Sequence, residues 1–483
     1  MKKKIIISIV AIFVIFIGFT VTKTLLAKSK QPTAKQQTHT LDENRIINNL
    51  SSAVKIKTIS YENRDQIDYS EFDKFIRFLA ETYPLVHENL SLERINEYSL
   101  IYRWEGTNPK ARPIGLAAHY DVVPVLKGTE NDWEEEAFSG TITEEFVWGR
   151  GTLDDKVGVI GILEAAEQLV KEGYQPPQDI YLLFGHDEEI GGDEGAAKIT
   201  DYLNEQNIQL AYVMDEGGAI VTNMVPGIKA PVGVIGVAEK GMADVTLTTT
   251  GSGGHSSQPA TITNVGRISK AIAKLEEQQF KAHFDGPTKE LFEFVAPEMS
   301  FGYKYVFENT WLFQPVITKI LLGKPATAAV MRSTIAPTIF HAGEKANVLP
   351  EKAQANINVR VMPQDTLESL QKDIEKIIDD EAIDVTVEGN EASPVSSTSN
   401  GAFQAIQQAA RDTYPDAIIA PYIMIAGSDA KHYARAADDT YRFLPIMMEE
   451  DGLQKMHGTN ERITKDAMIK AVAFYMTLLQ ETK

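Results

Sequence analysis

The chain has 483 residues, a formal net charge of −20 and no cysteine. Its length predicts two or three domains, and a hydrophobic fraction of 43% fits a globular protein with a substantial core. The acidic balance argues against nucleic acid as a partner, because no basic stripe could offset it. Without cysteine, disulfides and thiolate metal sites are excluded, so any metal must be held by histidine and carboxylate side chains.

The N-terminus carries an apolar segment with basic flanks. Three lysines precede an uncharged run from Ile5 to Thr22, which is near the lower length limit for crossing a bilayer. Because the residues before Ala27 fit a cleavage site poorly, we favour an uncleaved signal anchor with an extracytoplasmic catalytic domain over a secreted protein whose signal is cleaved. Lysines also follow the run, which weakens the argument for this orientation. Residues 1–28 are expected as the anchor or signal segment, and residues 29–40 as a flexible linker.

Three apolar runs, each typical of a buried strand, end in histidine and acidic residues. The run at 114–118 leads into His119 and Asp121, the run at 180–184 into Glu188 and Glu189, and the run at 210–214 into Asp215. In open α/β sheets, ligands bind just outside the carboxyl ends of strands. Asp154 lies on a loop that opens a predicted helix at 156–171 and is expected beside these strand ends. So many acids together would repel one another without a cation among them, and the pattern therefore predicts a metal site.

The individual residues are weak indicators of function, since a histidine at a strand end is more often structural and paired acids are usually caps or solvated turns. Their weight comes from falling together at strand ends and loops above one sheet. A loop-borne aspartate between two ligand-bearing strands suits a carboxylate that bridges two metal ions. Of two adjacent glutamates, one can bind metal while the other stays free as a general base.

Six motifs resemble those of the co-catalytic zinc exopeptidase and deacylase family, which includes aminoacylase, carboxypeptidase G, carnosinase and acetylornithine deacetylase. They are HYDVVP at 119–124, GRGTLDDK at 149–156, GHDEEIGG at 185–192, MDEG at 214–217, GSGGHSS at 251–257 and MHGTNERI at 456–463. The motifs span most of the chain after the linker, in the family's order. An aromatic-rich stretch at about 281–332 resembles the insert of the carboxypeptidase S branch and its secreted N-acyl-amino-acid hydrolase relatives.

The resemblance implies a centre of two zinc ions, with cobalt or manganese as substitutes. One ion would be bound by His119, Asp154 and Asp215, and the other by Asp154, Glu189 and His457. Asp121 would orient His119 through a hydrogen bond, and Glu188 would be the general base.

The resemblance also implies residues for substrate binding. His255, on the second domain, would polarise the scissile carbonyl, while Arg360 and Asn347 would hold the substrate carboxylate and the oxyanion. Gly427 and Ser428 resemble a glycine-threonine-aspartate loop of the family near the substrate, with serine in place of threonine. In family dimers the second-domain histidine serves the partner's site, so a homodimer is left open for this chain.

Strands that alternate with helices predict an α/β fold with a mostly parallel sheet, and the family adds an inserted smaller α/β sandwich of the lid or dimerisation type. Residues 41–231 and 391–483 would form the catalytic domain, and residues 232–390 the inserted domain. Within it, the stretch at about 281–332 is either a lid that offers an apolar wall to an acyl chain or a helical pair that packs on its own aromatics.

The predicted function is zinc-dependent hydrolysis of an amide bond in short peptides or N-acyl amino acids with a free C-terminal carboxylate. Two alternatives are a catalytically silent relative that binds peptides or amino acids, and a structural calcium site. Calcium prefers six to eight oxygen ligands, whereas two of the expected ligands here are histidines. The membrane would be contacted through the N-terminal segment.

Overall fold

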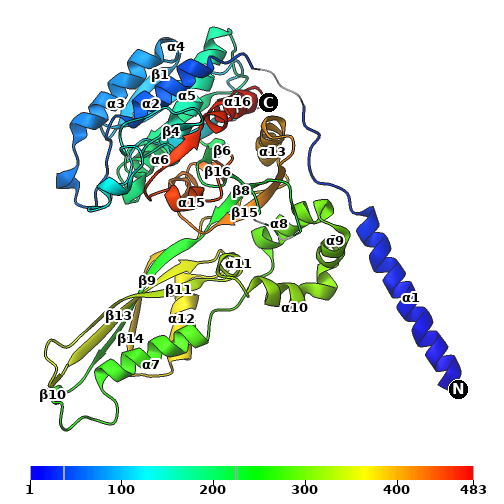
Figure 1. Ribbon diagram of the computed structural model, residues 1–483, viewed down its shortest axis with the longest axis vertical. Coiled ribbons are helices and arrows are strands. Elements are labelled where there is room, and N and C mark those ends of the chain that lie inside the picture. Colours follow the sequence, from blue (N-terminus) through cyan, green and yellow to red (C-terminus); the bar gives the residue numbers. More distant parts are fainter. Residues whose placement is uncertain (1, 36–38, 224, 226, 482–483) are drawn as a thin grey trace.

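The structure is a computed structural model that describes residues 2–35, 39–223, 225 and 227–481. Figure 1 shows a large domain built on a central sheet, a smaller domain that extends away from it, and a group of helices beside the junction of the two. The N-terminal helix α1 (Lys2–Leu26) projects outward next to that helical group.

Within the described residues, nine strands form the sheet of the large domain. In spatial order they are β1 (Ser91–Ile95), β2 (Ser99–Trp104), β5 (Ile180–Gly185), β3 (Ile114–His119), β6 (Leu210–Asp215), β16 (Ala437–Arg442), β8 (Val232–Glu239) and β15 (Ile418–Met424), with β7 (Ile220–Val221) paired to β8. β3 pairs in parallel with β5 and β6, β6 with β16, and β8 with β15. This mostly parallel sheet confirms the predicted α/β fold class.

Both faces of the sheet are covered because alternate side chains point to opposite sides. On β3, Leu116 and Ala118 join the larger hydrophobic core, whereas Ala117 joins the smaller one on the other face. The larger core is covered by α2 (Glu43–Val54), α3 (Tyr69–Thr82), α4 (Pro84–Asn89), α5 (Lys156–Lys171), α13 (Gly401–Thr413) and α16 (Lys465–Glu481), and the smaller by α6 (Ala196–Glu205) and α14 (Ala430–Tyr433). Short elements in the connections are η1 (Arg64–Gln66), η2 (Glu130–Asp132), η3 (Glu188–Ile190), α15 (Gly452–Lys455) and the paired strands β4 (Phe146–Trp148) and β17 (Arg462–Thr464).

The smaller domain is a four-stranded antiparallel sheet with two helices on one face. Its strands are β11 (Thr334–Ala342), β13 (Lys352–Val361), β9 (Gly241–Thr250) and β14 (Asp384–Asn390), and its helices are α7 (Asn264–Glu277) and α12 (Leu367–Ile378). Buried and more exposed residues alternate along β9 and β13, as expected for a sheet covered on one side. The short strands β10 (Gly254–His255) and β12 (Val348–Leu349) pair at the far tip (Figure 1).

The aromatic-rich stretch forms a group of helices, which we call the insert. They are α8 (Gly286–Val295), η4 (Ala296–Glu298), α9 (Phe301–Glu308), α10 (Thr310–Leu321) and α11 (Pro325–Ala329). The insert does not pack on its own aromatics alone, because Phe294 of α8 meets Phe403 of α13 edge to face, with ring centroids 5.7 Å apart. Its buried side chains thereby join the core of the large domain.

Residues 29–35, expected as the start of a flexible linker, lie against the large domain instead. The Gln31 side chain accepts a hydrogen bond from the Ile419 N–H at 2.8 Å and donates one to the Ile419 carbonyl at 3.0 Å. Because β15 is an edge strand, these bonds satisfy backbone groups that would otherwise face outward. Residues 36–38 of the expected linker lie outside the described residues.

Candidate metal centre

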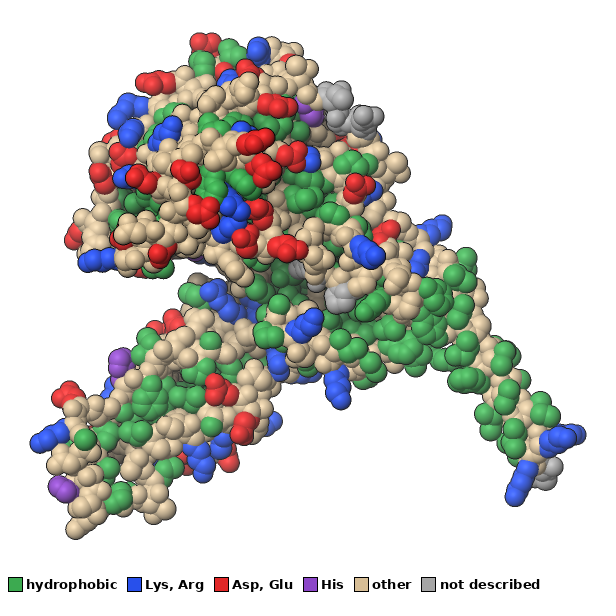
Figure 2. Space-filling model, viewed as in Figure 1, with side chains coloured by type: hydrophobic (Ala, Val, Ile, Leu, Met, Phe, Trp, Pro, Cys, Tyr) green, Lys and Arg blue, Asp and Glu red, His purple; other side chains and the backbone are tan. Residues whose placement is uncertain are grey.

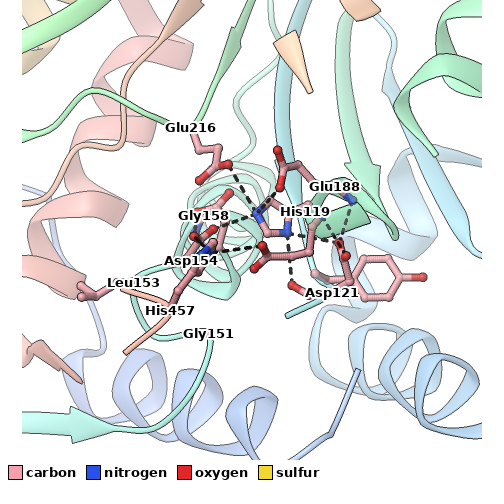
Figure 3. Close-up of polar contacts among 12 residues, drawn as sticks. His119, Asp121, Gly151, Leu153, Asp154, Gly158, Glu188, Glu216 and His457 are labelled. Atoms are coloured by element: carbon pink, nitrogen blue, oxygen red, sulfur yellow. Dashed lines mark hydrogen bonds and ion pairs between the residues drawn. The ribbon is translucent and has the colours of Figure 1, made fainter. Parts of the chain in front are cut away.

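The candidate site lies at the carboxyl ends of β3, β5 and β6, which meet at one edge because the three strands are neighbours and parallel. His119 is the last residue of β3, Glu188 and Glu189 lie in η3 just beyond β5, and Glu216 follows β6. Two loops complete the group, one before α5 that carries Asp154 and one after α15 that carries His457. Figure 3 shows the side chains of His119, Asp154, Glu188, Glu216 and His457 converging from separate parts of the chain.

Two groups of ligand atoms share Asp154. In the first, the Nε2 atom of His119 lies 2.9 Å from Asp154 Oδ1 and 3.4 Å from Glu216 Oε1. In the second, the Nε2 atom of His457 lies 2.9 Å from Asp154 Oδ2 and 3.1 Å from Glu189 Oε2. Each oxygen of Asp154 therefore belongs to a different group, which is the arrangement of a carboxylate that bridges two cations.

The first group differs from the sequence prediction at one position. Asp215 was expected there, but Glu216 supplies the oxygen next to His119. Asp215 ends β6 and is buried, and its carboxylate is not part of either group. The physical reason is that neighbouring residues at a strand end point in different directions, so only one of two adjacent acids can face His119.

The electrostatics of the cluster favour a cation. Burial raises the pKa of Glu189 to about 7 and that of Glu216 to about 8, because neighbouring acids add to the cost of desolvation. The Oε1 atom of Glu189 is buried and has no hydrogen-bond partner among the described residues. Hydrogen bonds to Asp154 and Glu189 raise the pKa of His457 to about 10. Carboxylates that are costly to ionise alone, beside two imidazoles, are a donor set that fits divalent metal ions with mixed nitrogen and oxygen preference.

Asp121 belongs to neither ligand group but holds residues of the centre in position through its contacts. Its Oδ1 atom lies 3.2 Å from Nδ1 of His119, which leaves Nε2 facing the two groups. The same carboxylate accepts hydrogen bonds from the backbone N–H groups of Glu188 and Glu189, at 3.1 and 3.2 Å, and from the Ser60 hydroxyl at 2.7 Å. One buried acid therefore positions residues from β3 and from η3 together.

A buried ion pair that sequence reasoning passed over ties the Asp154 loop to the His457 loop. Arg150 and Glu461 are 2% and 0% exposed, and their side chains form a salt bridge at 2.5 Å. Glu461 also accepts hydrogen bonds from the backbone N–H groups of Gly151 and Leu153, at 2.9 and 2.8 Å. Both charged residues stand in the quoted motifs, but their sequence positions gave no sign that they pair.

Two predicted site residues lie far from the centre. His255 and Asn347 stand at the tip of the smaller domain, the end that Figure 1 shows farthest from the central sheet. His255 is exposed, and its Nδ1 atom lies 2.8 Å from the Ser257 hydroxyl, while the Asn347 carbonyl accepts a hydrogen bond from the Ser256 N–H at 3.1 Å. Because β9 and β13 extend away from the large domain, both residues lie away from the centre of their own chain, and their role at a substrate stays a prediction.

The other predicted substrate-binding residues do not join the two groups either. Ser428 is fully buried, and its hydroxyl donates to Glu239 Oε2 at 2.9 Å, the same oxygen that accepts from Arg442. Gly427 precedes it in the loop after β15 and has open space on the side where a side chain would stand. Arg360, near the end of β13, is half-buried.

Known proteins match this chain over most of its length. Residues 115–481 match the family described as peptidase family M20/M25/M40. The chain is 39% identical over 476 residues to a probable carboxypeptidase S-like 2 of Dictyostelium discoideum, which covers 96% of this chain and 91% of that protein. It is 33% identical over 446 residues to an N-fatty-acyl-amino acid synthase/hydrolase of Xenopus tropicalis, which covers 91% of this chain and 86% of that protein.

Solved structures share the fold at lower identity. A crystal structure of an M20 family metallo-carboxypeptidase from Sulfolobus solfataricus matches with a TM-score of 0.63 and 18% identity, over 90% of this chain and 98% of that one. A Bacillus subtilis protein described as a dinuclear metal binding peptidase of the M20 family matches with a TM-score of 0.54 and 15% identity, over 90% of this chain and 97% of that one.

The fold and the ligand groups define a metal-dependent hydrolase of the two-domain kind. The chain belongs to the M20 peptidase family. Within that family its relatives are carboxypeptidase S-like proteins and N-fatty-acyl-amino acid hydrolases, which confirms the branch predicted from the aromatic-rich stretch and makes the chain an enzyme of this class.

Proposed function

We propose that this enzyme hydrolyses the amide bond of short peptides or N-acyl amino acids that carry a free C-terminal carboxylate. The observation that carries the proposal is the pair of ligand groups that share Asp154, with a further carboxylate beside them. Relatives named as carboxypeptidase S and as N-fatty-acyl-amino acid synthase/hydrolase support the same substrate classes.

The proposed cofactors are two zinc ions, for which cobalt or manganese can substitute. His119, Asp154 and Glu216 would hold one ion, and Asp154, Glu189 and His457 the other. When bound, such ions polarise a carbonyl oxygen and lower the pKa of water toward neutrality. The backbone around His457 supports a functional role, because its φ of 59° is uncommon for a residue other than glycine and must be held by its surroundings.

Glu188 is the proposed general base. Its Oε2 atom lies 4.0 Å from Nε2 of His119, and it belongs to neither ligand group. A free carboxylate at this position would take the proton from the attacking water and pass it to the leaving amine. Asp121 fixes the Glu188 backbone and so keeps the carboxylate aimed at the centre.

The proposed acylase or peptidase site is completed by a second copy of the chain. His255 and Asn347 lie away from the centre of their own chain, so their proposed roles at the scissile carbonyl require the smaller domain of a partner. Arg360 and the loop at Gly427 and Ser428 would then hold the substrate carboxylate end.

Mixing two inactive variants tests this homodimer. His255→Ala chains lack the carbonyl contact and Glu188→Gln chains lack the base, so a mixed dimer regains one complete site. We expect activity to return on mixing, with dimers present in sedimentation runs. Dimers that form and stay inactive would contradict the assignment of His255.

We also propose that α1 remains attached as a membrane anchor, with the enzyme on the extracytoplasmic side. Within the described residues, α1 is the one helix long and apolar enough to cross a bilayer. Its end is bonded to the insert, since the Thr20 hydroxyl lies 2.8 Å from the Tyr305 hydroxyl and Asn309 donates to Thr24 at 3.0 Å. Intact mass of the membrane-bound protein distinguishes an anchor from a cleaved signal.

Glu188→Gln tests the enzymatic mechanism. We expect turnover of dipeptides or N-acyl amino acids to fall about a hundredfold to ten-thousandfold, because only the proton transfer is lost. Metal content, measured by elemental analysis, should stay unchanged. Glu205→Gln, at the end of α6, is the matched control and should behave as the wild type.

The substrate screen varies the acyl chain length and the amino acid, with zinc supplied. Near-normal turnover in the Glu188→Gln variant would contradict the proposed base. Binding of these compounds without any metal-dependent turnover in the wild type would favour the alternative, a silent relative that acts as a binding module.

A further inference from the structure

Helix α10 of the insert is apolar on two adjacent sides, about 100° apart around its axis. Phe313, Ile317 and Leu321 face inward, and Ile317 is 2% exposed. Leu312, Val316 and Ile320 face outward, and Ile320 is 65% exposed. A water-exposed helix normally carries polar residues on its outer side, so this outer side indicates a second apolar neighbour.

The outer side of α10 is part of a larger apolar patch, which we call the outer insert surface. It comprises Phe301, Tyr303, Trp311, Leu312, Val316 and Ile320. Figure 2 shows hydrophobic side chains gathered over this part of the molecule and continuing onto α1. Contiguous apolar patches of this kind on soluble surfaces mark sites of association with proteins or membranes.

The position of α1 identifies which of these neighbours fits. The rings of Phe16 and Trp311 meet edge to face with centroids 5.9 Å apart. Phe16 lies seven residues before Lys23, or about 10 Å along the helix at 1.5 Å per residue. With Lys23 at the membrane surface, the Trp311 side chain therefore reaches about the depth at which interfacial helices bury their apolar faces.

The charge of residues 299–332, which hold α9 to α11 but not α8, points to the same neighbour. Between residues 299 and 332 the basic residues are Lys304, Lys319, Lys324 and Arg332, and the acidic residue is Glu308. The whole chain has a net charge of −20, so this segment reverses the sign of the rest. Basic side chains beside an apolar surface are attracted to anionic lipid headgroups, which would repel the remainder of the protein.

We propose that the outer insert surface enters the interfacial layer of the bilayer that α1 crosses, so that the chain contacts the membrane at two places. This inference rests on the proposed anchoring by α1. Because α8 of the insert packs onto the large domain, the second contact fixes the orientation of the catalytic domain relative to the bilayer. A single helical anchor followed by a linker would leave that orientation free.

Fluorescent labels on the full chain in liposomes test the proposal, and the absence of native cysteine makes single-site labelling clean. Ile320→Cys carries an environment-sensitive label on the outer insert surface. Ile9→Cys reports on α1, and Leu453→Cys, 71% exposed on the large domain, is the control. The liposomes contain phosphatidylcholine and phosphatidylglycerol, with or without bromine on the acyl chains.

We expect brominated lipid to quench the labels at positions 320 and 9 and to leave the label at 453 unchanged. Quenching at 9 without quenching at 320 would overturn the second contact while the anchor stands. No quenching at either position would overturn both. Amide hydrolysis, measured in the same preparations, reports separately on the proposed function.

Native tryptophan provides a measurement without a label. Trp311 is 55% exposed, whereas Trp104, Trp133 and Trp148 are buried. Brominated lipid should therefore quench the wild type more than Trp311→Phe, and equal quenching would overturn the proposal. Lys319→Glu with Lys324→Glu should reduce that quenching in phosphatidylglycerol, whereas Lys372→Glu on the smaller domain should not.

Discussion

The candidate metal centre and the outer insert surface are each exceptions to the usual distribution of side chains, in opposite directions. The centre buries a cluster of acids, Glu188, Glu189 and Glu216, although charged groups usually stay in water. The insert exposes large apolar side chains such as Trp311 and Ile320, although such groups usually pack inside. The acids of the metal centre are suited to bind divalent cations, and the apolar side chains of the outer insert surface are suited to contact lipid. In both regions, side chains that are unfavourable in the protein alone indicate the chemistry of a neighbour.

Asp154→Asn gives the largest expected effect, because it acts on both ligand groups at once. An amide has one oxygen to offer instead of two, so both ions should be held weakly. We expect elemental analysis to find less than one metal ion per chain after dialysis and turnover to fall on the order of a thousandfold. Asp201→Asn, on the exposed side of α6, is the control. Full metal content in the Asp154→Asn variant would contradict a shared ligand.

The two sides of α10 provide the second test, on the insert. Ile317→Ala removes a buried side chain and should lower the free energy of unfolding by about 3 kcal/mol. Ile320→Ala removes an exposed one and should change it by less than about 0.5 kcal/mol in detergent, where the surface is covered in both variants. Denaturant unfolding of the detergent-solubilised chain measures both. Equal losses would mean that the outer side packs against protein.

A third test separates the two adjacent acids at the end of β6, Asp215 and Glu216. Glu216→Gln keeps one oxygen that can still bind a cation, so the affinity for one ion should fall about tenfold to a hundredfold. Asp215→Asn leaves both ligand groups intact and should retain that affinity. Metal titration of the dialysed protein measures the difference. The reverse order would restore Asp215 as the ligand.

Local patterns made the strand and helix positions predictable. The helix predicted at 156–171 matches α5, because Asp155 caps its first turn and its apolar residues recur at helical spacing. The apolar residues Phe443, Leu444 and Ile446 come after β16, whereas β16 itself runs from Ala437 to Arg442 and carries polar residues such as Asp438 and Asp439. A strand whose outer residues are polar has no apolar run to reveal it.

The parts of the site at the ends of strands were predictable from the sequence, whereas contacts that depend on tertiary placement were not. His119 and Asp154 come together because strand ends and the following loops meet at one edge of the sheet. Two adjacent acids differ only in direction, which composition does not encode. Pairing between Arg150 and Glu461, and the distance of His255 from the centre, depend on tertiary placement that no local pattern contains.

Lys240 joins the central sheet to the end of the insert, and its titration gives the smallest expected effect. It follows β8, and its ammonium group donates to the carbonyls of Ala329 and Arg332 at the end of the insert, at 3.0 and 2.9 Å. Burial, helped by Arg360, lowers the pKa of Lys240 to about 7. Between pH 7 and about 10 the unfolded chain therefore holds a proton that the folded chain has released, and stability rises with pH.

Lys240→Met removes this titration and keeps a side chain of similar length. The wild-type free energy of unfolding, relative to that of the variant, should increase between pH 7 and 9 by at most about 1.4 kcal/mol per pH unit. Lys372→Met, with an exposed lysine, should show no such slope. A difference between wild type and Lys240→Met that stays constant with pH would mean that the insert carbonyls keep Lys240 charged, so that a buried cation holds the end of the insert to the central sheet.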